Sequence, residues 1–393
     1  MTMFPEALRG IRAAALSRRI SRQAAGLGAF TLLALSGCVS TPHPADGTTA
    51  PYPRSRYITG AEWDFSMRVS HRKAHGSDLW PCAWASDGNL YCAWGDGGGF
   101  DGDSDTTGRV SLGFARVAGV PDAADADSLT GKNVWGAAPD FAEHPATFGG
   151  KVTSLISVRG TLYGHGDLWT VAAPDATQRG GAGPVHTRIW SADLGRTWKV
   201  APWSDEWSQT FLSFGPDNAG APGDFVYIYY TRPTGTQRIY LKRIPAAALE
   251  ADPTSRAFEY FTGLAWWGRP RGWSRDESLA RPVFVDRNGT DAQVVYDAPL
   301  RRYLLTSGHG PKAGRVGLFE APQPWGPWRT VGYYDNWGNL AAPADGEYLG
   351  VSLPAKWIGA DGRTLWALFS ALGEFDSFNL ARVTLTLSAT ERR

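Results

Sequence analysis

From about residue 58 onward, apolar and polar positions alternate in short runs that are separated by Gly, Pro, Asn and Asp. Aromatic and β-branched residues fill the apolar positions, and turn residues recur about every ten positions. A period of two with frequent turns predicts β-strands. No convincing amphipathic helix is present, although Ile244–Leu249 could form one helical turn. The pattern therefore predicts an all-β domain.

One hairpin pattern occurs five times in this domain. Each copy contains a strand, a turn and a second strand that is centred on an aromatic residue. The turns and aromatic strands are expected at Asp87–Tyr91, Arg159–Tyr163, Gly223–Tyr227, Leu300–Tyr303 and Asp361–Trp366, and the strands before them at Leu79–Ala85, Lys151–Val158, Ser208–Phe214, Gln293–Tyr296 and Ser352–Ile358. The aromatic positions lie 72, 64, 76 and 63 residues apart. This period suits four-stranded sheets and predicts a five-bladed β-propeller. A β-sandwich is the alternative, but it predicts no repeat at this period.

The segment Ser191–Trp198 supports the same fold. Its pattern Ser-x-Asp-x-Gly-x-Thr-Trp resembles the Asp-box of sialidases and related propellers. The resemblance implies that Asp193 binds backbone amides in a turn and that Trp198 packs between sheets. Such a turn is structural and says little about activity. Most of the 18 tryptophans are likewise expected in the core.

The first 37 residues have the pattern of a signal peptide. Several arginines, from Arg9 to Arg22, precede an apolar run over residues 24–35 that is too short to span a bilayer. The run ends in Leu-Ser-Gly-Cys38, which resembles the lipobox of bacterial lipoproteins. The resemblance implies lipidation of Cys38, and Val39 after it favours an outer-membrane address, periplasmic or surface-exposed. A plain secretory signal with an incidental cysteine is the alternative, and the export route stays open.

The domain boundaries follow from these patterns. Residues 38–57 contain several Pro, Ser, Thr, Gly and Ala, which predicts an extended tether between the lipid anchor and the folded domain. The propeller is expected over residues 58–390. The charge is nearly balanced, with 39 Lys and Arg against 38 Asp and Glu, so no overall field favours nucleic acid. We expect a monomer whose partners are a polysaccharide and, through the lipid, a membrane.

The first predicted hairpin contains two residue pairs with the same register. If the hairpin turns about Asp87, cross-strand partners have numbers that sum to 174, which pairs Cys82 with Cys92 and Asp78 with Asp96. Only Cys82 and Cys92 remain after lipidation of Cys38, and an exported protein meets an oxidising compartment. The pattern therefore predicts a cross-strand disulfide, with two free buried thiols as the alternative.

The two aspartates are the candidate catalytic residues. Innermost propeller strands converge on the axis, so facing carboxylates there would titrate as a coupled pair, with one pKa raised. Such a pair can supply an acid and a base at one pH. The alternative is structural: Asp96 caps a glycine-rich turn and Asp78 binds backbone amides.

The first blade also resembles a known family. The pattern Ser77-Asp78-Leu79, Asp87-Gly88, Leu90-Tyr91 and Gly95-Asp96 is similar to the opening blade of domain of unknown function 4185, part of which is glycoside hydrolase family 183, endo-acting on D-arabinofuranose polymers. Similar stretches recur over residues 60–388. The resemblance implies Asp78 and Asp96 as catalytic acids and Lys151 as a channel-lining, substrate-binding residue. Many relatives are expected to have Gly and Thr where this chain has Trp80 and Gly97.

Further substrate contacts are expected from rings and from strand ends. Trp80 is a candidate because aromatic rings stack on sugar faces, and His165 and His309 because they end the second strands of two blades near the channel mouth. A hydrogen-bonded turn histidine is the alternative for both. Glu206, Asp276 and Glu277 precede strands expected to line the axis, so one of them could be a third acid.

No cofactor is required by this chemistry. Asp101–Asp105 imitates the start of a calcium loop but lacks the later Gly and Glu, so calcium is open and no metal site is predicted. No Gly-x-Ser-x-Gly, P-loop or zinc-type spacing is present. The sequence therefore predicts a glycoside hydrolase acting on a cell-envelope or extracellular polysaccharide. The alternative is a non-catalytic outer-membrane propeller that binds glycan or protein.

Overall fold

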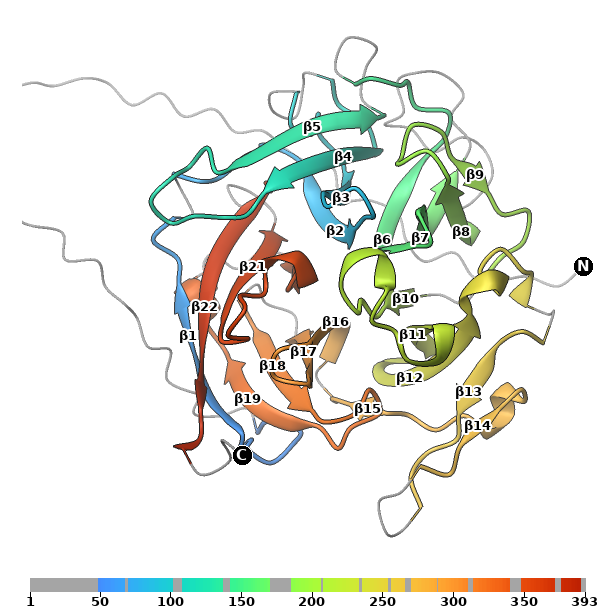
Figure 1. Ribbon diagram of the computed structural model, residues 1–393, viewed down its shortest axis with the longest axis vertical. Coiled ribbons are helices and arrows are strands. Elements are labelled where there is room, and N and C mark those ends of the chain that lie inside the picture. The colour runs from blue at the N-terminus through green and yellow to red at the C-terminus, as the bar shows by residue number, and fades with distance from the viewer. Residues whose placement is uncertain are drawn as a thin grey trace, which may run out of the picture. The chain divides into compact units, whose positions relative to one another are not determined.

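The strands form a closed ring of five antiparallel sheets around a common axis (Figure 1). The computed structural model describes residues 49–67, 70–101, 108–136, 142–169, 185–205, 208–232, 235–253, 256–265, 270–287, 289–309, 314–339, 348–371 and 376–389. The expected all-β, five-bladed β-propeller is confirmed. Helical structure in the described part is limited to 3-10 segments.

The first, second and fourth blades each have four strands in chain order from the axis outward. The first blade contains β2 (Asp78–Trp84), β3 (Leu90–Gly95), β4 (Leu112–Gly119) and β5 (Leu129–Trp135). The second contains β6 (Gly149–Val158), β7 (Thr161–Trp169), β8 (Val185–Ser191) and β9 (Lys199–Val200). The fourth contains β16 (Gly289–Asp297), β17 (Arg302–His309), β18 (Val316–Ala321) and β19 (Arg329–Tyr334).

The third and fifth blades depart from this order. The third contains β10 (Ser208–Phe211), β11 (Phe225–Arg232), β12 (Gly235–Pro245), β13 (Glu259–Phe261) and β14 (Trp273–Ser274), and β15 (Phe284–Val285) pairs with β12. The fifth contains β20 (Tyr348–Ser352), β21 (Thr364–Ala371), β22 (Asn379–Leu387) and, outermost, β1 (Ile58–Asp64). The 3-10 segments are η1 (Pro216–Asn218), η2 (Pro222–Asp224), η3 (Ala246–Ala248), η5 (Glu277–Leu279), η6 (Trp337–Asn339) and η7 (Ala355–Trp357).

The five predicted hairpins are the two innermost strands of the five blades. The first strand of each hairpin, β2, β6, β10, β16 or β20, lies at the axis. Because the blades repeat one order, these strands run in the same direction, and we call the end at which they begin the mouth. The last hairpin differs from the prediction, because β20 stops at Ser352 and η7 follows Pro354, which has no N–H for a sheet ladder.

The ring closes where the two ends of the domain meet. β1, blue in Figure 1, pairs with β22, red, so that the fifth blade is completed by the start of the domain. Residues before β1 also pack on the protein. Ser55 N donates to Thr330 O at 2.8 Å, and the Tyr52 ring lies against Phe284 and Phe319. The packed domain thus begins ahead of the expected boundary at residue 58.

Large side chains fill the space between neighbouring blades. Trp63, Trp80, Trp94, Trp135, Trp337 and Trp357 are all fully buried or nearly so. Burying each such ring stabilises the fold by about 1.5–3 kcal/mol. The contacts expected from the Ser191–Trp198 pattern are present: Asp193 Oδ1 accepts from Thr197 N at 2.9 Å, and the Trp198 ring stacks on Phe114 of the first blade with centroids 4.0 Å apart.

Candidate functional site

A pocket lies on the propeller axis near the mouth. Its empty volume is about 670 Å³, and all five innermost strands contribute to it. Its lining includes Leu79, Pro81, Thr153, Ser208, Gln209, Thr210, Gln293, Gly350 and Ser352. A second cavity of about 580 Å³ lies further along the axis, where Cys82, Phe211, Ser213 and Leu353 are among its lining residues. The axis therefore has two concave spaces that are lined by both polar and apolar residues.

The register of the first hairpin differs from the prediction at the mouth. Cys82 pairs with Cys92 as expected, but Asp78 pairs with Gly95, so the expected pairing of Asp78 with Asp96 is wrong by one residue. β2 has one residue more than β3 between the two pairs, and the extra residue forms a β-bulge. Leu79 and Trp80 adopt φ values of 74° and 59° there. Pro81 has no N–H to donate, which favours a break in the ladder at this point.

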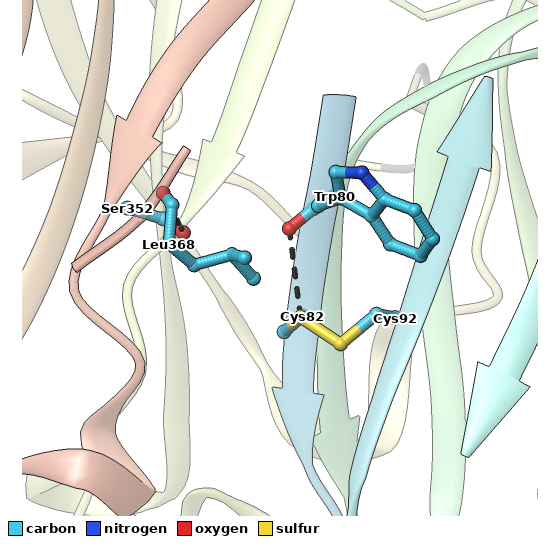
Figure 2. The surroundings of a disulfide bond; sticks show 5 residues. All are labelled: Trp80, Cys82, Cys92, Ser352 and Leu368. Atoms are coloured by element: carbon cyan, nitrogen blue, oxygen red, sulfur yellow. Dashed lines mark hydrogen bonds between the residues drawn. A yellow bond between two sulfur atoms is a disulfide. The ribbon is translucent and has the colours of Figure 1, made fainter. Parts of the chain in front are cut away.

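The predicted disulfide is confirmed. Cys82 and Cys92 are bonded across β2 and β3, with Cα atoms 4.1 Å apart. Figure 2 shows the bond between the two strands, with Ser352 of the neighbouring fifth blade to the left of β2. The disulfide fixes the register of the hairpin between the bulge and the turn.

Lys151 brings the two predicted aspartates together in spite of the register shift. Its Nζ lies 3.5 Å from Asp78 Oδ1 and 3.0 Å from Asp96 Oδ1. Arg109 Nη2 lies 3.6 Å from Asp96 Oδ2. The side chains of Asp78, Lys151 and Asp96 are 9%, 28% and 39% exposed. The site therefore combines a nearly buried carboxyl with an open one, and a single ammonium lies between them.

Glycines make room for this cluster. A Cβ atom on Gly95 would lie 2.3 Å from Asp78 Oδ1 and 2.6 Å from Lys151 Nζ, so a side chain here would collide with both charged groups. Gly97 has a φ of 77°, and a Cβ there would lie 2.3 Å from Gly76 O. The backbone at Gly97 thus requires glycine, and a side chain at position 95 would displace the charged groups of the cluster.

The surroundings of Asp78 shift its titration strongly. Burial is the largest cause, and it raises the pKa of Asp78 to about 7 against the attraction of Lys151, while the carboxylates of Asp376 and Asp96 raise it further. A carboxyl with this pKa exchanges its proton near neutral pH. Asp78 can therefore act as an acid while a more exposed carboxylate beside it serves another role.

Three expected substrate contacts are buried instead. The Trp80 ring is fully buried against Trp94, Phe100 and Phe378. His165 is fully buried too, and burial lowers its pKa to about 3. His309 is 1% exposed and stacks on Tyr333 with centroids 3.7 Å apart. The three rings are thus buried among protein side chains, while Trp80 also contributes to the lining of the axial pocket. Their contact with a sugar stays a prediction.

The candidate third acids do not join the site in the described part of the chain. Glu206 lies outside the described residues. Asp276 caps η5 by accepting from Ser278 N at 2.9 Å, and Glu277 lies 3.5 Å from Arg232. Both precede β15, which pairs with β12, and neither comes directly before an innermost strand. The expectation that they lead into the axis is wrong, because η5 and β15 intervene.

Other charged residues near Asp78 had no motif to reveal them. Asp376, on the β21–β22 connection, acts on Asp78 electrostatically, and its backbone O accepts from Gly76 N at 2.7 Å. Asp167 lies opposite Lys151 on β7, and its carboxylate contacts the ring of His186. The sequence pattern had pointed to His165 at the end of this strand. Asp167, two residues further along, is a carboxylate and is more exposed than His165.

Metal and membrane features are limited in the described residues. They contain no group of three or more His, Cys, Asp or Glu side chains that could hold a metal ion. Asp101 Oδ2 accepts from Asn133 N at 2.7 Å, and the rest of the calcium-like segment lies outside the described residues. No helix in the same part is long and apolar enough to cross a membrane. Cys38 also lies outside it.

Comparisons with known proteins find similarity in structure but not in sequence. No family model and no curated protein matches the chain. A family 117 glycoside hydrolase, Zg3597, from Zobellia galactanivorans is 10% identical over 86% of this chain and 93% of that chain, with a TM-score of 0.40. A GH43_1 enzyme from Xanthomonas citri is 11% identical over 82% and 95%, with a TM-score of 0.43. The α-L-arabinofuranosidase PaAbf62A from Podospora anserina is 13% identical over 84% and 99%, with a TM-score of 0.41. All three TM-scores lie below 0.5.

Proposed function

We propose that the protein is a glycoside hydrolase that cleaves a cell-envelope or extracellular polysaccharide, with Asp78 as the general acid. The observation behind this proposal is a carboxyl group with a pKa of about 7 that shares one ammonium with a second carboxylate. Asp78 and Lys151 lie on β2 and β6, and both strands also contribute residues to the axial pocket. Glycosidic bonds are cleaved by two such carboxyl groups in different environments.

The proposed mechanism gives the aspartates separate roles. Protonated Asp78 donates its proton to the glycosidic oxygen as the C–O bond breaks. Asp96, whose negative charge is balanced by Lys151 and Arg109, attacks the anomeric carbon and forms a glycosyl-enzyme. Asp78 then takes a proton from water, whose oxygen displaces Asp96 and releases the sugar.

The distances favour this retaining course. Since Lys151 Nζ is 3.5 Å and 3.0 Å from the two Oδ1 atoms, those atoms cannot be further apart than the sum of the two distances. That limit includes the separation of about 5–5.5 Å in retaining glycosidases and reaches only the lower end of the ~6.5–9.5 Å found in inverting ones. Two carboxylates are therefore sufficient, without a third acid.

The substrate class follows from the pocket and from the family resemblance. Thr153, Ser208, Gln293 and Ser352 offer hydroxyl and amide groups to a hydroxyl-rich ligand. The resemblance of the first blade to the family of domain of unknown function 4185 favours a D-arabinofuranose polymer, cut internally.

The proposed location is the cell envelope, through lipid on Cys38 at the outer membrane, with the protein acting as a monomer. Changing Cys38 to Ala should move the protein from the membrane fraction to the soluble periplasmic fraction, because several acyl chains are needed for stable anchoring. If the Cys38→Ala protein stayed with membranes, the lipidation proposal would be rejected.

A glycan panel tests the proposed activity. Wild type, Asp78→Asn and Asp276→Asn would each be incubated with polysaccharides that include D-arabinofuranose polymers, and released reducing ends would be measured. We expect release by wild type and by Asp276→Asn, whose changed carboxyl caps η5, and a loss of 100-fold or more for Asp78→Asn. Equal release by Asp78→Asn and wild type would reject Asp78 as the acid. Binding without release by wild type would instead identify a glycan-binding propeller.

A further inference from the structure

A strongly basic depression lies on the fourth blade, away from the mouth. Its empty volume is about 930 Å³, and its lining contains four arginines: Arg54, Arg56, Arg302 and Arg329. Pro53, Tyr57, Pro322 and Pro327 complete most of its wall. Two arginines come from the segment before β1 and two from the fourth blade, so the depression forms only when that segment is packed in place.

The backbone around the depression is fixed. Arg54 forms a parallel bridge with Thr330, and Thr330 N donates to Pro53 O at 2.9 Å. The Arg302 guanidinium lies 4.0 Å from the centroid of the Tyr57 ring. Strand pairing thus holds the backbone of Arg54, and ring contact holds the side chain of Arg302.

The charge of the depression is not balanced from within. Glu320 is the one acidic residue among its lining residues, and it is 4% exposed. Its Oε2 lies 3.3 Å from Arg302 Nε, and its Oε1 accepts from Ser55 Oγ at 2.7 Å. Arg54, Arg56 and Arg329 are exposed.

Within the described residues, no carboxylate forms an ion pair with Arg54, Arg56 or Arg329. Among the described residues, three guanidinium groups of the depression therefore have no acidic partner. Planar guanidinium groups bind phosphate oxygens through two hydrogen bonds each, which makes a phosphate group the anion that best fits them.

The place of the depression indicates where the phosphate comes from. Arg302 begins β17, directly after the turn from β16, so the depression lies at the end of the blades opposite to the mouth. Pro53 follows the proposed lipid-bearing Cys38 by 15 positions. A segment of that length reaches at most about 50 Å, so the depression stays within that distance of the anchor.

We propose that this depression binds the phosphate group of anionic phospholipid headgroups at the membrane in which the protein is anchored. In this orientation the end of the propeller opposite to the mouth faces the bilayer. The mouth, with Asp78, faces away from it. The site is separate from the proposed hydrolase centre and stands without it.

Soluble headgroups test this site on the full chain. Binding of glycerophosphoglycerol, inorganic phosphate and zwitterionic glycerophosphocholine would be measured by calorimetry on wild type and on the triple variant Arg54→Gln/Arg56→Gln/Arg329→Gln. A matched triple variant, Arg196→Gln/Arg238→Gln/Arg287→Gln, makes the same change in net charge on exposed arginines outside the depression. We expect glycerophosphoglycerol to bind wild type and the matched variant equally, and the depression variant at least tenfold more weakly.

The three probes separate the sources of phosphate. Glycerophosphoglycerol binding more tightly than inorganic phosphate supports the headgroup. Binding of inorganic phosphate alone would reject the lipid source, and no difference between the depression variant and wild type would reject the site. Should the triple variant fail to fold, Arg329→Gln alone gives the same comparison, with a smaller expected loss of about threefold.

Discussion

The protein contains two clusters in which an aspartate meets basic side chains, and their surroundings differ sharply. At the mouth, Asp78 and Asp96 share Lys151, and the three side chains are 9–39% exposed. Between the second and third blades, Asp205 Oδ2 lies 2.5 Å from Arg188 Nη2 and Asp205 Oδ1 lies 3.3 Å from Lys242 Nζ, and all three side chains are 0% exposed. The residue types are nearly the same, so burial distinguishes the two clusters.

The inner cluster is closed to any ligand. Arg188 also donates to Leu249 O at 2.7 Å and lies over the Trp203 ring, while Lys242 Nζ lies 4.3 Å from the centroid of Phe258. Rings and a carbonyl also contact these cations, which come from β8 of the second blade and β12 of the third, so the cluster joins blades. The mouth cluster has an open side and a carboxyl that titrates near pH 7, which suits chemistry. Similar charged residues thus serve packing in one place and are available for proton transfer in the other.

The largest expected effect comes from breaking the inner cluster. Asp205→Asn leaves the charges of Arg188 and Lys242 buried without a carboxylate, and the free energy of unfolding should fall by about 3–5 kcal/mol. Urea denaturation of wild type and Asp205→Asn measures this loss in the free energy of unfolding. The same substitution at exposed Asp96 is the control and should cost less than about 1 kcal/mol. Equal losses in the two variants would remove the distinction between the clusters.

The mouth cluster should show the opposite behaviour. Asp78→Asn and Asp96→Asn should each lower kcat/KM on a cleaved glycan by 100-fold or more, about 2.7 kcal/mol in the activation free energy, because one removes the acid and the other the attacking carboxylate. Thermal unfolding should show both variants folded. Near-normal turnover by either variant would exclude that residue from the chemistry.

The disulfide beside the bulge is expected to support the mouth cluster. Replacing both Cys82 and Cys92 with Ser should lower the free energy of unfolding by about 2–3 kcal/mol, since the closed loop is short. Guanidinium denaturation of oxidised wild type and of the double variant measures the difference. Thiol titration of denatured, unreduced wild type should find no free thiol at these positions, and two free thiols would contradict the bond.

The mouth cluster should also reduce stability at neutral pH. The pKa of Asp78 is about 7 in the folded protein and near 3.8 when unfolded, so the folded state holds a proton that the unfolded state has lost. Stability from this group is therefore full below about pH 4 and is lost as the pH rises through 7. Asp78→Asn should be more stable than wild type at pH 8, on the order of 1–2 kcal/mol allowing for partial solvent access, with no gain at pH 4. Identical pH dependence of the two proteins would contradict the raised pKa.

Much of the fold and part of the site could be predicted because local patterns determine them. Five aromatic hairpins predicted five blades, and a single turn at Asp87 predicted the disulfide. The family resemblance implied Lys151 as a site residue, and its ammonium lies close to both Asp78 and Asp96. The role of β1 in closing the ring had no local signal, because its partner β22 lies more than 300 residues later.

Burial and small backbone irregularities could not be predicted from the same patterns. Trp80 would have shared a face with Asp78 in a regular strand, but the bulge at Leu79 and Trp80 turns the ring into the core. His165 ends a predicted strand near the mouth, yet neighbouring blades cover it. Asp376 reaches Asp78 from a connection in another blade, so only the assembled ring shows the contact.

The smallest expected effect concerns Lys151, which lies between the two carboxylates of the mouth. Its positive charge lowers the pKa of Asp78, so Lys151→Met should raise that pKa further, by about one pH unit for a charge this near. A general acid is active while protonated, so the alkaline limb of the kcat/KM profile should move to higher pH, whatever the loss in absolute rate. Lys132→Met, which removes an exposed partner of Glu143, is the matched control and should leave the limb in place. A limb that stayed near pH 7 or moved to lower pH in Lys151→Met would show that Asp78 is not the titrating acid, because the field of Lys151 acts on Asp78 in one direction only.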